Sequence, residues 1–272
     1  MNLEDHAGDL IRKARSMAGV PVGAAATATG LDVANYRVLE REGKISAGTN
    51  LRAVARLVGL DADKLERLAR GWRPAPVELA QWSSLRCFTT ADADMSVNCF
   101  LVWDAATRAA ALFDTGFDAA PVLAMIERER LRLEHIFITH GHSDHVEGLV
   151  TLRGKFSGAR VHWNGANAAG SRNQPGEAVS VGRLSVTHRL TPGHAEDGVT
   201  YVIHGWPNPA PAVAVVGDAL FAGSVGLSPA GWEVARTAIT KEILSLPSAT
   251  LICPGHGPLT TVGEELGNNP FF

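Results

Sequence analysis

The sequence predicts a small all-α unit followed by a larger α/β domain. Over residues 9–70 the apolar side chains recur at intervals of three and four, which is the period of a helix. After Pro76 short β-type runs alternate with helical stretches, a pattern typical of α/β domains. The 272 residues are 46% hydrophobic and 19% charged, a composition that excludes a disordered chain. We expect a first domain at 1–74, a linker at 75–83 and a second domain at 84–272.

The first unit is expected to contain about five short helices joined by tight turns. Glycine-containing turns divide the helical pattern at Gly19, Gly30, Gly43 and Gly59. Asp32 and Asp61 each stand where the N-cap of a helix would lie. The segment WRPAP at residues 72–76 ends the pattern and is predicted to be the start of the linker.

The second part alternates between strand and helix signals. Strands are expected at 99–102, 110–113, 136–139, 184–187, 199–203, 212–216 and 250–253. Helices are expected at 119–134, 143–156 and 232–246.

Charge and cysteine content exclude several classes of protein. The cysteines Cys87, Cys99 and Cys253 form no CxxC pair, so neither a disulfide framework nor a thiolate zinc finger is expected. The apolar runs are too short for a membrane span, and the N-terminus lacks the basic and apolar regions of a signal peptide. We therefore predict a cytoplasmic protein without a membrane partner.

The charge is distributed unevenly along the sequence. Residues 1–74 hold 12 Lys and Arg against 9 Asp and Glu, whereas the whole chain has a net charge of −3.

The strongest chemical signal is the sequence HGHSDH, directly after the predicted strand 136–139. It places four candidate metal ligands within six residues: His140, His142, Asp144 and His145. A strand that ends in a tight loop can direct several side chains to one point, and imidazole with carboxylate suits zinc or iron.

Three further candidates, His194, Asp218 and His256, each follow a predicted strand and a glycine. If these strand ends share one edge of the fold, all seven side chains converge. Seven ligands exceed what one tetrahedral ion needs and suit two ions that share a carboxylate bridge, for which Asp218 is the candidate. Asp144 and Asp218 are the expected catalytic carboxylates. Such a pair of ions activates a shared hydroxide for hydrolysis. Zinc is the expected metal, with iron and manganese as open alternatives.

This motif set resembles that of the metallo-β-lactamase superfamily over roughly residues 84–272. The resemblance implies an αβ/βα sandwich with two metals at one edge. By the family pattern His140, His142 and His194 hold the first metal, Asp144, His145 and His256 hold the second, and Asp218 bridges them. Asp114 resembles the early Asp-x-Gly turn of the superfamily, where it would orient a ligand histidine; the alternative is an aspartate that only closes a β-turn.

Within the superfamily, residues 217–226 and 254–261 are similar to the glyoxalase II-like branch. The resemblance implies hydrolysis of a small-molecule thioester, such as a hydroxyacylglutathione, or of a related ester. Leu227 departs from that branch, which often has arginine there. True β-lactamases usually lack the aspartate at position 218, which disfavours antibiotic hydrolysis. A persulfide dioxygenase with a single iron and a phosphodiesterase remain alternatives on the same fold.

Residues 9–70 resemble the helix-turn-helix of phage repressors of the Cro/CI class. The resemblance places the recognition helix after Asp32, where Asn35 and Arg37 are the candidate DNA contacts. It also implies a homodimer that binds two half-sites. The chain would then be a DNA-binding regulator whose metal domain senses a small metabolite. The other reading is a helical unit retained for dimerisation or for covering the active-site edge.

Overall fold

The computed structural model describes residues 2–93, 95–165, 171–174, 176–207, 210–228 and 231–272. The first helices are α1 (Ala7–Met17), α2 (Val22–Thr29), α3 (Val33–Glu42), α4 (Leu51–Val58) and α5 (Ala62–Ala69). The expected short helices before residue 70 are therefore confirmed. The predicted caps are present, because the carboxylates of Asp32 and Asp61 accept hydrogen bonds from the amides of Asn35 and Lys64.

The expected DNA contacts lie at the start of α3. The Asn35 side-chain amide donates to the Asp32 carboxylate at 2.8 Å, so this amide is engaged within its own helix end. Arg37 is exposed. DNA binding through residues 9–70 stays a prediction.

After the short helix η1 (Leu79–Trp82), two β-sheets form. The first has the order β1 (Leu85–Asp92), β2 (Met95–Trp103), β3 (Ala109–Phe113), β4 (Arg132–Phe137) and β5 (Arg160–His162). The second has the order β13 (Thr260–Thr261), β12 (Leu251–Pro254), β9 (Val213–Gly217), β8 (Val199–His204), β7 (Leu184–Leu190) and β6 (Ala178–Val181). Strands β3, β4 and β5 run parallel, as do β9 and β12. A separate hairpin is formed by β10 (Leu220–Phe221) and β11 (Ser224–Val225).

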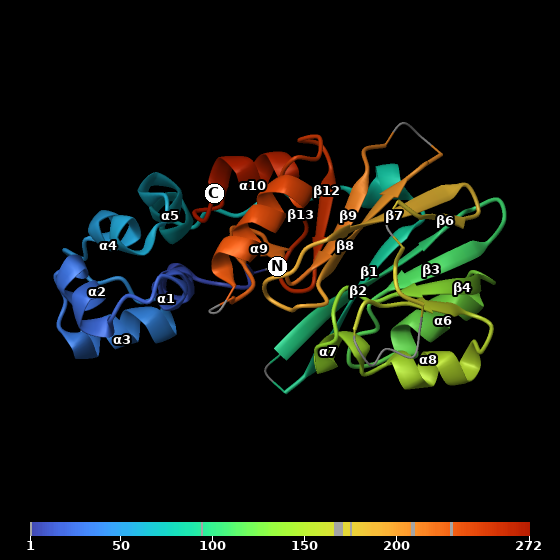
Figure 1. The fold of residues 1–272 in the computed structure, drawn as a ribbon, viewed down its shortest axis with the longest axis horizontal. Helices are drawn as coiled ribbons and strands as arrows, with labels where there is room; N and C mark the ends of the chain where they lie inside the picture. The colour runs from blue at the N-terminus through green and yellow to red at the C-terminus, as the bar shows by residue number, and fades with distance from the viewer. Residues whose placement is uncertain (1, 94, 166–170, 175, 208–209, 229–230) are drawn as a thin grey trace.

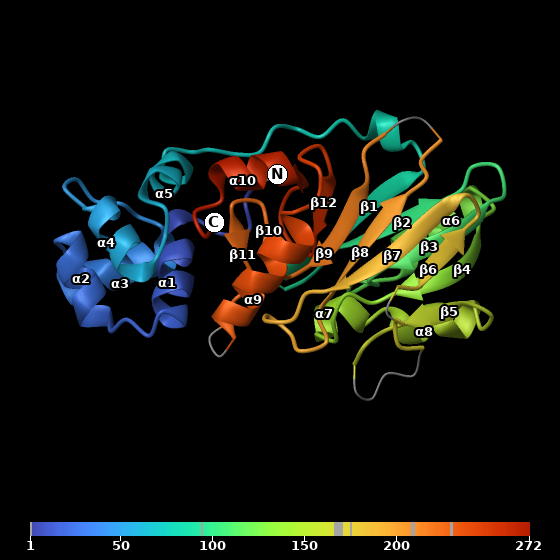
Figure 2. The same cartoon turned by 45° about the horizontal axis from the view of Figure 1, so that its top comes forward.

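The two sheets pack face to face, and helices cover their outer faces (Figures 1 and 2). Every residue of β3 and β9 is buried, which explains why these strands are continuous apolar runs. Between the sheets the rings of Phe113 and Phe137 stack with centroids 4.9 Å apart, and Tyr201 packs against both. Helices α6 (Ala120–Arg128) and α8 (Leu149–Lys155) cover the first sheet; α9 (Trp232–Ala238) and α10 (Val262–Asn268) cover the second.

The helical unit packs against the C-terminal end of the chain. The Lys64 ammonium donates to the Phe272 carbonyl at 2.5 Å, and Arg67 donates to the Gly267 carbonyl at 2.7 Å. The amide of Asp61 donates to the Pro270 carbonyl at 2.8 Å. The chain from α5 to η1 runs along one side of the molecule (Figure 2). Helix α5 therefore holds the C-terminal residues in place.

Several expected element boundaries are wrong. The helix expected at 119–134 ends at Arg128, and Arg130 adopts a φ of 53° before β4 begins. The helix expected at 143–156 is divided into α7 (Ser143–Val146) and α8, while the one at 232–246 changes from α9 into a π-helix, η2 (Ile239–Ile243). Strand β4 ends before Thr139, which lies in the loop. Six strands and helix α10 were not expected: β1, β5, β6, β10, β11 and β13.

Of the helices in the described ranges, none is both long and apolar enough to cross a membrane.

Candidate metal centre

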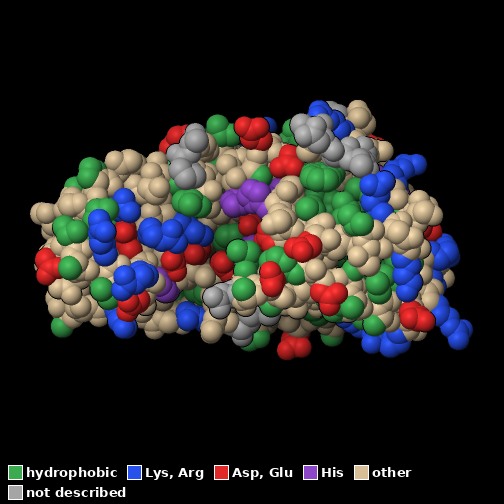
Figure 3. Space-filling model, turned by 90° about the horizontal axis from the view of Figure 1, so that it is seen from below, with side chains coloured by type: hydrophobic (Ala, Val, Ile, Leu, Met, Phe, Trp, Pro, Cys, Tyr) green, Lys and Arg blue, Asp and Glu red, His purple; other side chains and the backbone are tan. Residues whose placement is uncertain are grey.

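The seven predicted ligands meet at one edge of the sandwich, although they come from four separate strand ends. His140 and His142 lie in the loop after β4, and Asp144 and His145 lie in α7, which follows that loop. His194 follows β7, Asp218 follows β9 and His256 follows β12. The space-filling view shows histidine side chains near the middle of one face, with acidic side chains close by (Figure 3). The convergence expected from the strand ends is present.

Three histidines form the first group. The His142 Nδ1 atom lies 3.0 Å from His140 Nε2 and 3.0 Å from His194 Nε2. His140 is buried, whereas His142 is exposed and His194 half-buried. Three nitrogens that point at one another in this way can hold one metal ion.

The second group contains Asp144, His145 and His256, and Asp218 lies between the two groups. The Asp144 Oδ2 atom is 3.4 Å from His145 Nε2 and 3.2 Å from His256 Nε2. One Asp218 oxygen lies 3.2 Å from His145 Nε2, and the other lies 3.3 Å from His256 Nε2 and 3.6 Å from His194 Nε2. A carboxylate that faces both groups has the placement of a bridge.

The second ring nitrogen of each of four histidines is hydrogen-bonded away from the centre. The Nδ1 atom of His256 donates to the Ser96 carbonyl at 2.5 Å, and that of His194 to the Leu227 carbonyl at 3.3 Å. The ring nitrogens of His140 and His145 reach Asp114, as described next. Such bonds fix the tautomer, so that each Nε2 presents a lone pair to the centre.

Asp114 is connected to one histidine of each group. Its Oδ2 atom accepts from His145 Nδ1 at 2.8 Å and from the Thr139 hydroxyl at 2.7 Å. The same hydroxyl lies 3.1 Å from His140 Nδ1, so His140 donates to Thr139 and Thr139 to Asp114. Asp114 is buried and has a φ of 55°, a left-handed conformation uncommon for a residue with a side chain. Asp114 therefore orients ligand histidines and does not only close a turn. Thr139, which links Asp114 to His140, was not predicted as part of the site.

The carboxylates of the centre stabilise positive charge on the neighbouring histidines. Burial opposes protonation of His145, but the charge and hydrogen bond of Asp114 and the nearby charge of Asp218 outweigh it and raise the pKa of His145 to about 10. Burial would raise the pKa of Asp218, yet its contacts with His145 and His256 hold that pKa well below its ordinary value. Burial lowers the pKa of His140 to about 3, so that imidazole is neutral and free to ligate.

Two buried atoms of the centre have no hydrogen-bond partner among the described residues: His145 Nε2 and Asp218 Oδ1. Unsatisfied buried polar atoms are costly in a folded protein, and a cation between them would satisfy both. Imidazole and carboxylate are the donors that zinc, iron and manganese accept. The residues present therefore fit metal ions, and the His/Asp clusters are suited to binding them.

Gly255 leaves the space that the centre needs. A Cβ atom at this position would lie 2.2 Å from Asp218 Oδ1 and 2.6 Å from His145 Cε1. We expect Gly255→Ala to displace both side chains and to lower metal content measured by elemental analysis. Gly154→Ala is the control, because its Cβ would meet nothing within 4 Å. Equal metal content in the two variants would contradict this role of Gly255.

The comparisons with known proteins agree with this geometry. The sequence profile of the metallo-beta-lactamase superfamily matches residues 93–256. The hydroxyacylglutathione hydrolase GloC of Haemophilus influenzae is 30% identical over 204 residues, which cover 64% of this chain and 92% of that protein. The human mitochondrial persulfide dioxygenase ETHE1 is 30% identical over 213 residues, covering 74% of this chain and 78% of that protein.

A solved structure extends the likeness to three dimensions. The protein TTHA1623, solved in a di-iron-bound form, superposes with a TM-score of 0.52 at 27% identity, covering 68% of this chain and all of that one (100%). The Cro/CI resemblance of the helical unit has no counterpart in these comparisons. With two sheets flanked by helices and the family profile spanning the metal centre, the chain belongs to the metallo-beta-lactamase superfamily.

Proposed function

We propose that this protein is a dinuclear metal-dependent hydrolase of a thioester or a related ester. The observation that carries the proposal is the placement of Asp218 between two groups of ligands, each of which can hold one ion. Similarity to the hydroxyacylglutathione hydrolase of Haemophilus influenzae supports the thioester, and the di-iron form of TTHA1623 supports two metals.

In this proposal His140, His142 and His194 would hold one ion, and Asp144, His145 and His256 would hold the other. When bound, divalent ions lower the pKa of a coordinated water and polarise the carbonyl group under attack. Asp218 faces both ligand groups and fixes the two metal sites relative to each other. Asp114 orients His140 and His145 through their Nδ1 atoms. Asp144 and Asp218 supply the negative charge that offsets the two ions.

The proposal is tested by elemental analysis of the purified protein together with hydrolysis of a set of lactoyl thioesters. We expect two metals per chain and release of free thiol that stops after treatment with a chelator. Thiol release that continues at full rate after the metal is removed would refute the proposal.

A second candidate is a persulfide dioxygenase, because human ETHE1 is 30% identical over 74% of this chain. The same measurements separate the two activities. One iron per chain and oxygen consumption with a persulfide would favour the dioxygenase, whereas two metals and thiol release would favour the thioesterase.

A further inference from the structure

The N-terminal segment Asn2–His6 reaches the metal centre. A Cβ atom on Gly257 would lie 3.1 Å from the Glu4 amide nitrogen and 3.3 Å from Glu4 Cβ. Glu4 is therefore seated against the residue that follows the ligand His256. A segment more than 250 residues away in the sequence thus supplies a wall of the site.

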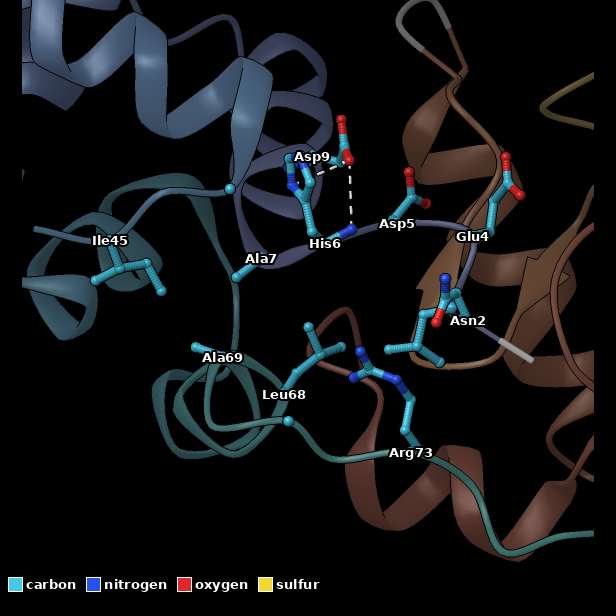
Figure 4. Close-up of a pocket in the computed structure, with 13 residues that line it drawn as sticks. Asn2, Glu4, Asp5, His6, Ala7, Asp9, Ile45, Leu68, Ala69 and Arg73 are labelled. Atoms are coloured by element: carbon cyan, nitrogen blue, oxygen red, sulfur yellow. Dashed lines mark hydrogen bonds and ion pairs between the residues drawn. The ribbon is translucent and has the colours of Figure 1, made fainter. Parts of the chain in front are cut away.

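Buried contacts hold this segment in position. The Asp5 carboxylate accepts from Lys13 Nζ at 2.5 Å and from the Ser224 hydroxyl at 2.6 Å, and all three side chains are buried. Figure 4 shows Glu4 and Asp5 along the chain between His6 and Asn2, beside a cavity of about 410 Å³ that Leu68 and Arg73 also line. Because Asp5 is fixed on both sides, the adjacent Glu4 is positioned as well.

On its other side Glu4 borders a cavity of about 690 Å³ that extends to the metal centre. Its lining residues include Glu4, Asp92, Met95, Phe117 and the ligand Asp144. Two carboxylates outside the ligand set face this space, and no lysine or arginine is among these lining residues. The nearby Lys13 is occupied by Asp5.

The inner end of this cavity is lined by the candidate metal ligand Asp144. Asp144 Oδ2 lies 3.4 Å from His145 Nε2, a fully buried atom with no hydrogen-bond partner among the described residues. A molecule that enters along Glu4 and Asp92 therefore arrives at the centre. Among the described residues that line the cavity, the carboxylates outside the ligand set are those of Glu4 and Asp92.

We propose that Glu4, together with Asp92, selects thioesters whose thiol portion carries a positive charge over those whose thiol portion carries a carboxylate. This inference rests on the proposed thioesterase function. A tenfold preference corresponds to about 1.4 kcal/mol, which the attraction between two unit charges near a protein surface can supply. Met95 and Phe117 offer apolar contact for the alkyl part. A glutathione thioester carries more carboxylate than ammonium groups and is accordingly a poor substrate.

The kinetic test compares lactoyl thioesters of thiocholine, which is permanently cationic, and of mercaptopropionate, which is anionic. We expect kcat/KM to be about tenfold higher for the thiocholine ester, and Glu4→Gln to lower that ratio by about three- to tenfold. Asp92→Asn should lower it in the same direction. Glu127→Gln, an exposed acid on α6 outside the cavity, is the matched control and should leave the ratio unchanged.

A binding measurement makes the result independent of turnover. Thioether analogues of the two esters, which cannot be hydrolysed, are titrated into each variant by calorimetry. The cationic analogue should bind more tightly, and Glu4→Gln should reduce the difference. Failure to hydrolyse either ester while this binding preference is present would count against the thioesterase function alone. Equal binding of both analogues, or a preference that Glu4→Gln and Asp92→Asn leave unchanged, would overturn the selection proposed here.

Discussion

Replacing Asp218 by asparagine is expected to lower kcat/KM by about a thousandfold and to reduce the metal content from two ions per chain to about one. Loss of an interaction worth several kcal/mol has an effect of this size. Asparagine preserves the shape of the side chain but removes the charge that faces both ligand groups, at 3.2 Å from His145 and 3.6 Å from His194. Elemental analysis and thiol release on the same sample measure the two effects.

The control is Asp197→Asn, which removes a carboxylate from the same edge of the sandwich. The Asp197 Oδ2 atom accepts from Trp163 Nε1 at 2.8 Å and takes no part in either ligand group. This variant should retain two metals. If Asp218→Asn also retained two metals and full activity, Asp218 would not be a bridge.

The metal centre was largely predictable because its ligands occur in short, recognisable stretches of sequence. His140, His142, Asp144 and His145 lie within six residues that span the short loop after β4 and the start of α7, so one segment positions all four. Gly217 precedes Asp218 and adopts a φ of 52°, a conformation that glycine takes without strain. The positions of the histidines and glycines in the sequence therefore predicted most of the geometry of the metal centre. Thr139 was missed as a link to Asp114 because a threonine at a strand end has no distinctive signal.

The element boundaries were less predictable where apolar spacing is ambiguous. Leu131 and Leu133 continue the helical pattern of α6 and also suit the alternation of β4. The helix ends at Arg128, and Arg130, which is not a glycine, takes a φ of 53° while the Leu131 amide donates to the Ile126 carbonyl at 2.9 Å. The position of Glu4 beside Gly257 had no sequence signal, because the two residues are more than 250 positions apart in the chain.

Breaking the buried pair of Asp5 and Lys13 is expected to destabilise the protein strongly without removing a metal ligand. Among the described residues, Asp5→Ala leaves the buried Lys13 ammonium with the Val225 carbonyl, at 3.0 Å, as its one acceptor. Removal of one partner of a buried ion pair typically costs about 3–5 kcal/mol. Urea unfolding followed by circular dichroism measures this loss. The exposed pair of Arg52 and Asp63 is the control, and Asp63→Ala should cost less than about 1 kcal/mol.

The double variant Asp5→Asn with Lys13→Met separates the charge from the packing. It removes both charges, while the asparagine oxygen still accepts from the Ser224 hydroxyl, so most of the lost stability should return. If the double variant is as unstable as Asp5→Ala, the pair contributes through its shape and not through its charge. The Lys13 ammonium also lies 5.1 Å from the centre of the Phe221 ring, which is 5.7 Å from the ring of His256. Because these contacts join the helical unit to the metal centre, Asp5→Ala should loosen Glu4 and reduce the charge preference at temperatures where the protein is still folded.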